Sequence, residues 1–217
     1  MAGRQGAAGA EPEAVQIFDR RLAGRVGRLL VMSNSYAQAV LRTTDIAEAL
    51  RVVGQLLDLA DTGELEVDFE ARVSTADELE RLTGVMPDAD WWSYGADRHG
   101  SSREGNSPSE CLPIFMSRWC MSPEAVEAFL AAAGNVPAMV RWDFSGWPEA
   151  PEVGLGCGGT RGAYVTLCVN ARDLYLEEPS TEHAVYVHVK QVEARRATWL
   201  AAQAGLQVIG ELQMAPL

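Results

Sequence analysis

The clearest pattern in the chain is a strict alternation of apolar and charged residues over positions 64–73. The apolar members are Leu65, Val67, Phe69, Ala71 and Val73, and the charged members are Glu64, Glu66, Asp68, Glu70 and Arg72. Successive side chains of a β-strand point to opposite faces, so this pattern predicts a half-buried strand. We expect Val67 and Phe69 to be buried, and Glu66 and Asp68 to be exposed.

Apolar residues spaced three and four apart predict several helices. Thr44 and Asp45 mark one helix start, Ser74 with Asp77 marks a second, and Ser122 followed by Pro123 marks a third. The helices are expected over residues 12–29, 45–60, 75–84, 123–133 and 191–204.

Further strands are expected over residues 111–120, 136–144, 163–170, 184–190 and 206–214, whereas residues 35–42 suit a strand or a helix. The order strand, helix, strand then occurs around residues 36–73, 112–144 and 184–214. The hairpin-like pair 138–144 and 163–170 argues against a purely parallel sheet. We therefore predict an α+β fold with a mixed or mostly antiparallel sheet, helices packed mainly on one face, and three strand–helix–strand units.

The domain organisation is predicted from composition. Residues 1–10 are small and polar and are expected to form a flexible tail, and residues 11–217 are expected to form a single α+β domain. Residues 85–110 are rich in Gly, Ser and Asp without a sustained period, which predicts a long loop and a candidate sub-domain boundary. Trp91, Trp92 and Tyr94 fall within this loop.

The net charge limits the kinds of partner to expect, and the cysteine content indicates the cellular compartment. The formal net charge is −12, and residues 45–90 alone hold thirteen acidic residues against three arginines. This balance argues against direct nucleic-acid binding and against an anionic membrane as the main partner. No window approaches the ~18 apolar residues of a membrane span. The cysteines lack CxxC spacing, which favours buried thiols in the cytoplasm over two disulfides: Cys111, Cys120, Cys157 and Cys168.

The sequence offers no catalytic, cofactor or metal site. Gly154, Gly156 and Gly159 match the pattern G-x-G-x-x-G. A nucleotide-binding loop of this pattern follows a strand and precedes a helix, and the flanking residues predict neither. A wide turn is therefore expected. His183 and His188 should point to opposite faces of one strand. Asp97, His99 and Ser101 lie together in the long loop, where the geometry of a catalytic triad is rarely held. The sequence therefore favours a binding protein over an enzyme.

The partner-binding residues predicted are the acidic strand and the loop aromatics: Glu64, Glu66, Asp68, Glu70, Trp91, Trp92 and Tyr94. The acidic face would dock a basic protein partner, and the plainer interpretation is a solvated edge strand protected by charge. The hypothesis is an acidic, non-enzymatic binding protein, such as an inhibitor or immunity-type partner of a basic protein or a nucleic-acid-acting enzyme. The alternatives are an enzyme or small-ligand binder with a site under loops 85–110 and 145–162, and a structural component of a larger assembly. The oligomeric state stays open.

Overall fold

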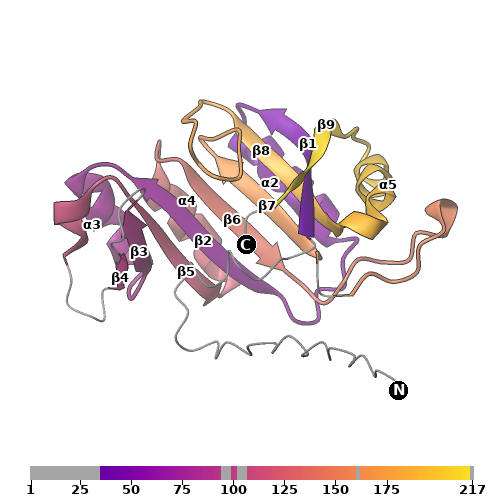
Figure 1. The fold of residues 1–217 in the computed structure, drawn as a ribbon, viewed down its shortest axis with the longest axis horizontal. Helices are drawn as coiled ribbons and strands as arrows, with labels where there is room; N and C mark the ends of the chain where they lie inside the picture. The colour runs from indigo at the N-terminus through magenta and orange to yellow at the C-terminus, as the bar shows by residue number, and fades with distance from the viewer. Residues whose placement is uncertain (1–34, 94–98, 102–106, 160–161, 216–217) are drawn as a thin grey trace, which may run out of the picture. The chain divides into compact units, whose positions relative to one another are not determined.

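An antiparallel sheet of nine strands organises the described residues, in the order β4-β3-β5-β2-β6-β7-β8-β1-β9 (Figure 1). The computed structural model describes residues 35–93, 99–101, 107–159 and 162–215. The strands are β1 (Ser35–Thr43), β2 (Glu66–Val73), β3 (Asp90–Ser93), β4 (His99–Ser101), β5 (Ile114–Met121), β6 (Ala138–Asp143), β7 (Tyr164–Val169), β8 (His183–Lys190) and β9 (Ile209–Met214).

The α+β class and the antiparallel sheet are confirmed, but a sheet built from three strand–helix–strand units is not. The segments do run strand, helix, strand along the chain. However, β2 lies between β5 and β6, and β1 lies between β8 and β9, so the two strands of a later unit flank an earlier strand instead of pairing with each other. Sequence order does not reveal such an insertion, because the hydrophobic pattern of a strand does not name its neighbours.

The helices lie on one face of the sheet. They are α2 (Ile46–Leu57), α3 (Ala76–Val85), α4 (Val126–Ala133) and α5 (Arg195–Gln203). α2 contacts β1, β7 and β8, α5 contacts β8, and α3 packs on α4. Their buried side chains share the larger core cluster with one face of the strands, whereas the smaller cluster on the other face contains no residue of a described helix. None of the helices in the described part of the chain is long and apolar enough to cross a membrane.

The predicted helix starts are close to those observed. Asp45 caps α2 by accepting a hydrogen bond from the Ala47 N–H. The cap of α3 is Thr75, one residue after the Ser74 predicted, and Glu78 completes its capping box. Ser122 caps a short 3₁₀ turn, Pro123–Ala125, that leads into α4.

The strand predicted at residues 64–73 forms, but its position in the sheet was predicted wrongly. Val67 and Phe69 are buried and Glu66 is exposed, as expected. Asp68 and Glu70 are buried, which contradicts the expected exposure. The reason is that β2 is a central strand paired on both sides, not a solvated edge strand. A central strand whose polar side chains are compensated within the sheet shows the same alternation as an edge strand.

The segment 85–110 is not one continuous loop. It contributes β3 and β4 to the same sheet and a 3₁₀ turn at Pro108–Cys111. Residues 32–217 form one compact unit without a division in this segment. The predicted tail 1–10, the helix 12–29, Tyr94 and Asp97 lie outside the described residues.

The glycine-rich segment 145–162 lies between β6 and β7, as predicted, and is tied down by buried side chains. Trp147 donates its indole N–H to the carbonyls of Gly162 at 3.1 Å and His188 at 2.7 Å. The buried guanidinium of Arg196 in α5 donates to the carbonyls of Pro148 and Gly156. A Cβ at Gly146 would lie 2.1 Å from the Gly158 carbonyl oxygen, so this close approach requires glycine. These contacts hold the described part of the segment, residues 145–159 and 162, against β8 and α5.

Phe69 tests the packing between β2 and the helices. Its ring stacks on Phe129 of α4 with centroids 4.3 Å apart, and both rings are buried. We expect Phe69→Ala to lower the free energy of unfolding by about 3–5 kcal/mol and the control Glu66→Ala by well under ~1 kcal/mol, measured by urea denaturation. Equal losses in the two variants would contradict this packing.

Candidate functional site

The face of the sheet opposite the helices, here called the open face, gathers polar side chains from neighbouring strands. Strand register places Asp68 opposite Arg141, Arg141 opposite Thr166, and Thr166 opposite Tyr186. Alternation along each strand adds further members to this face: Glu66, Glu70, Asp143, Tyr164 and His188. Several of these groups are buried, so their charges and hydrogen bonds must be compensated within the structure.

Arg141 is the centre of the open face. Its Nη2 lies 2.6 Å from Asp68 Oδ2 and its Nε lies 3.0 Å from Asp143 Oδ1. The side chains of Arg141 and Asp68 are 8% and 9% exposed. Burial alone would lower the pKa of Arg141, but the carboxylates of Asp143 and Asp68 raise it above its usual value. The guanidinium therefore stays charged and is held in one position.

Two aromatic rings flank this guanidinium. Its central carbon lies 5.6 Å from the ring centroid of Trp119 and 5.1 Å from that of Tyr164. These distances are within the range of cation–π contacts. Both rings are half-buried, so each keeps part of its surface accessible beside the buried ion pair.

His188 lies in the next register row and is buried as a neutral imidazole. One ring nitrogen, Nε2, lies 2.8 Å from Thr166 Oγ1, and the Tyr164 ring meets the imidazole edge-on at 5.7 Å. Burial, together with the nearby charge of Arg141, lowers the pKa of His188 to about 3. His183 points to the other face of β8, as predicted, and both imidazoles are buried rather than on the surface.

The four predicted acidic residues have different environments. Glu64 and Glu66 are exposed, whereas Asp68 and Glu70 are buried. Asp68 accepts a hydrogen bond from the Cys120 N–H at 2.9 Å in addition to its pair with Arg141. Only part of the predicted acidic surface is therefore directly available to a partner.

The predicted aromatic residues separate onto the two faces of the sheet. Trp91 is buried in the core on the helix side. Trp92 lies on the open face and stacks on Phe115 of β5 with centroids 5.4 Å apart. Tyr94 lies outside the described residues.

The cysteines are free thiols, but the expectation that they are buried holds only in part. Cys168 is buried, Cys111 is half-buried, and Cys120 and Cys157 are exposed. Burial raises the pKa of the Cys168 thiol well above its usual value, so this thiol is an apolar member of the smaller core cluster and not a nucleophile.

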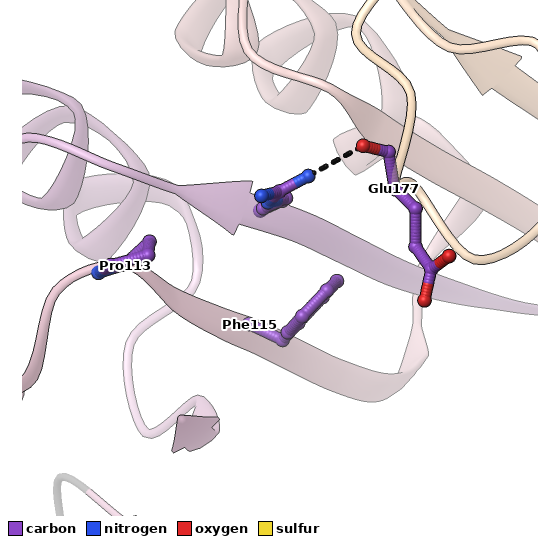
Figure 2. A pocket seen from close by; sticks show the side chains of 4 residues that line it. Pro113, Phe115 and Glu177 are labelled. Carbon is purple, nitrogen blue, oxygen red and sulfur yellow. Dashed lines mark hydrogen bonds between the residues drawn. The ribbon is translucent and has the colours of Figure 1, made fainter. Parts of the chain in front are cut away.

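A cavity of about 360 Å³ opens on the open face where β2 ends, lined by Arg72, Pro113, Phe115 and Glu177. Figure 2 shows Phe115 between Pro113 and Glu177. Arg72 Nη1 donates to the carbonyls of Leu176 at 3.2 Å and Glu177 at 2.7 Å, which ties the β7–β8 connection to β2. The cavity therefore combines a cation, a carboxylate and an apolar floor.

A second hollow of about 640 Å³ has a neutral lining: Thr44, Asn135, Asn170, Pro179, Ser180, Thr181 and His183. The Asn170 N–H donates to His183 Nδ1 at 3.2 Å. Burial lowers the pKa of His183, which outweighs the opposite effect of Asp45. The strand that follows segment 85–110 begins beside Val73 at one end of β2, and the strand that precedes segment 145–162 ends beside Glu66 at the other end.

Sequence reasoning assigned no site role to Arg141, Trp119, Tyr164, His188 and Glu177. A signal existed for the first of these, because Arg141 and Asp143 are polar residues two apart in the strand expected over residues 136–144. The others come together only through the pairing of distant strands, or through the β7–β8 connection.

The burial of His188 predicts an acid-sensitive stability. An unfolded imidazole has a pKa of about 6.5, whereas the folded protein keeps His188 neutral to about pH 3. Between these values the unfolded state binds a proton that the native state does not, so stability falls as the pH falls. We expect the wild type to lose about 2 kcal/mol more than His188→Gln between pH 7 and pH 5, measured by urea unfolding. Equal losses would show that His188 is not held neutral.

Comparison of the chain with protein-family models, with curated proteins and with solved structures found no match. The chemistry of the open face is therefore the basis for inferring its function.

Proposed function

We propose that the chain is a non-enzymatic binding protein that docks a basic protein partner on the open face, as an inhibitor or immunity-type partner. The observation that carries this proposal is that two carboxylates and two half-buried aromatic rings surround one arginine. Arg141 is paired with Asp68 and Asp143, and Trp119 and Tyr164 flank it.

The charge balance around Arg141 favours a cationic partner. Asp68 and Asp143 contact one guanidinium, and exposed Glu66 lies opposite Asp143 in the strand register. Among the residues that the structure describes, carboxylates therefore outnumber the cation at the centre of this face. The chain's net charge of −12 adds a long-range field of the same sign, which speeds the encounter with a basic protein.

The aromatic residues supply the short-range contacts that such a surface needs. Trp, Tyr and Arg are the residue types most enriched at the centres of protein interfaces. Here the three types are adjacent, and the ion pairs hold Arg141 in place before any partner arrives. Preorganised side chains lose little conformational entropy on binding, so more of the contact energy is available as affinity.

An inhibitor of a nucleic-acid-acting enzyme suits this chemistry. A surface on which carboxylates exceed cations can occupy a basic groove that otherwise holds phosphates. The same surface repels nucleic acid itself. Free thiols at Cys111, Cys120, Cys157 and Cys168 suit a reducing compartment, which supports a cytoplasmic location.

The experiment is to capture the partner from lysate of the source cells at low salt and to measure its association rate with purified variants. We expect Glu64→Lys with Glu66→Lys to slow association by about tenfold or more, and the effect to fade between 0.1 M and 1 M salt. The matched control is Glu80→Lys with Glu127→Lys, which makes the same charge change at exposed positions on α3 and α4. This control should slow association much less, because it leaves the open face intact.

A second variant separates contact from steering. Trp119→Ala should raise the dissociation rate by about tenfold or more while leaving the association rate nearly unchanged. The proposal fails if the two charge variants have equal association rates, or if Trp119→Ala dissociates like the wild type.

A further inference from the structure

The hollow of about 640 Å³ around Asn170, here called the Asn170 hollow, lies at one end of the sheet. It collects residues from four segments that end or begin there: Thr44 after β1, Asn135 before β6, Asn170 after β7 and His183 at the start of β8. Its volume falls within the range of small-molecule sites.

Asn170 joins the walls of this hollow by hydrogen bonds. Its side-chain Nδ2 donates to the carbonyls of Gly134 at 2.8 Å and Val136 at 3.0 Å. Its main-chain carbonyl accepts the Ser180 N–H at 2.9 Å, and its own N–H donates to His183 Nδ1 at 3.2 Å. The φ of Asn170 is 53°, in the left-handed region that asparagine adopts more readily than most residues. The walls are therefore in place before a ligand binds, which lowers the entropic cost of binding.

The same hydrogen bonds determine which polar atoms remain for a ligand. Both amide hydrogens of Asn170 are used, so its Oδ1 is left as an acceptor. His183 accepts at Nδ1, so its neutral ring carries the hydrogen on Nε2, for which the described residues provide no acceptor. The His183 residue is only 8% exposed, and burial keeps its pKa low and its ring uncharged at neutral pH. The hollow thus has one oriented donor and one oriented acceptor, both neutral.

Hydroxyl groups complete the polar lining, at Thr44, Ser180 and Thr181. Ser180 Oγ accepts the Glu182 N–H at 3.0 Å, and its own hydrogen stays available for donation. None of the lining residues that the structure describes carries a charge at neutral pH. The negative charge of Asp45 acts on His183 and so disfavours an anion in the hollow.

This lining matches a neutral ligand with several neighbouring hydroxyl groups. Each hydroxyl of such a ligand both donates and accepts, as the oriented donor, the oriented acceptor and the lining hydroxyls require. Pro179 adds an apolar surface suited to the C–H face of a sugar ring. A nucleobase would need an aromatic ring to stack on, and the described lining contains no Trp, Tyr or Phe.

We propose that the Asn170 hollow binds a neutral saccharide. One sugar hydroxyl accepts from His183 Nε2–H, another donates to Asn170 Oδ1, and the C–H face of the ring lies on Pro179. The hollow is lined by other residues than those of the surface around Arg141, so this proposal does not depend on the proposed docking function.

The test uses the full 217-residue chain and three neutral sugars: D-glucose, D-galactose and D-mannose. Binding is followed by the NMR signals of the His183 imidazole, with His188, which lies on the other face of β8, as the internal control. We expect one of the three sugars to shift the His183 signals saturably and to leave those of His188 unchanged. The matched uronates, D-glucuronate, D-galacturonate and D-mannuronate, should bind more weakly because the lining supplies no cation.

Matched variants assign the binding to the hollow. Thr44→Val with Thr181→Val removes two lining hydroxyls while keeping the side-chain shape, and should weaken sugar binding by roughly tenfold or more. Thr62→Val with Thr198→Val makes the same change outside the hollow and should leave the affinity unchanged. Both double variants should fold, since the four threonines are exposed.

The proposal is overturned if none of the three sugars causes a saturable shift at millimolar concentration. It is also overturned if the uronates bind more tightly than the neutral sugars, which indicates an anion site, or if the two double variants have equal affinity. None of these results bears on the docking surface, whose test uses a protein partner.

Discussion

The central position of β2 is the constraint on which the arrangement of the open face depends. β2 is paired with β5 on one side and with β6 on the other. Its apolar side chains pack against the helices, and its charged side chains lie beside side chains of the neighbouring strands. A charge buried in this way is stable only when an opposite charge and hydrogen bonds compensate it. Asp68 satisfies this condition through Arg141 and through the Cys120 N–H.

The ion pair in turn determines the character of the surface around it. Holding Arg141 beside Asp68 and Asp143 places the guanidinium between Trp119 and Tyr164. Burial, with a smaller effect of this guanidinium charge, lowers the pKa of His188. Buried pairs of this kind add little net stability compared with apolar residues of similar shape. We therefore interpret this one as a means of positioning accessible aromatic rings and excess carboxylates on a rigid sheet.

The β7–β8 connection has a comparable role at the end of β2. It is held by Arg72 on one side and by Asp173 within itself, and it brings Glu177 to a cavity floored by Phe115. The open face thus has two chemically distinct areas. Among the described residues, one area places carboxylates around a guanidinium, and the other combines a guanidinium, a carboxylate and an apolar floor.

The sequence by itself determined the α+β class, the helix starts near Asp45 and Ser122, and the burial of Val67 and Phe69. These features depend on spacing along the chain, which a periodic pattern reports directly. The tertiary structure decided that β2 is central, that Asp68 is buried, and that Arg141 and His188 share a face with it. Local pattern cannot contain these facts, because an alternating strand has the same pattern at an edge and at the centre, and only long-range pairing selects its neighbours.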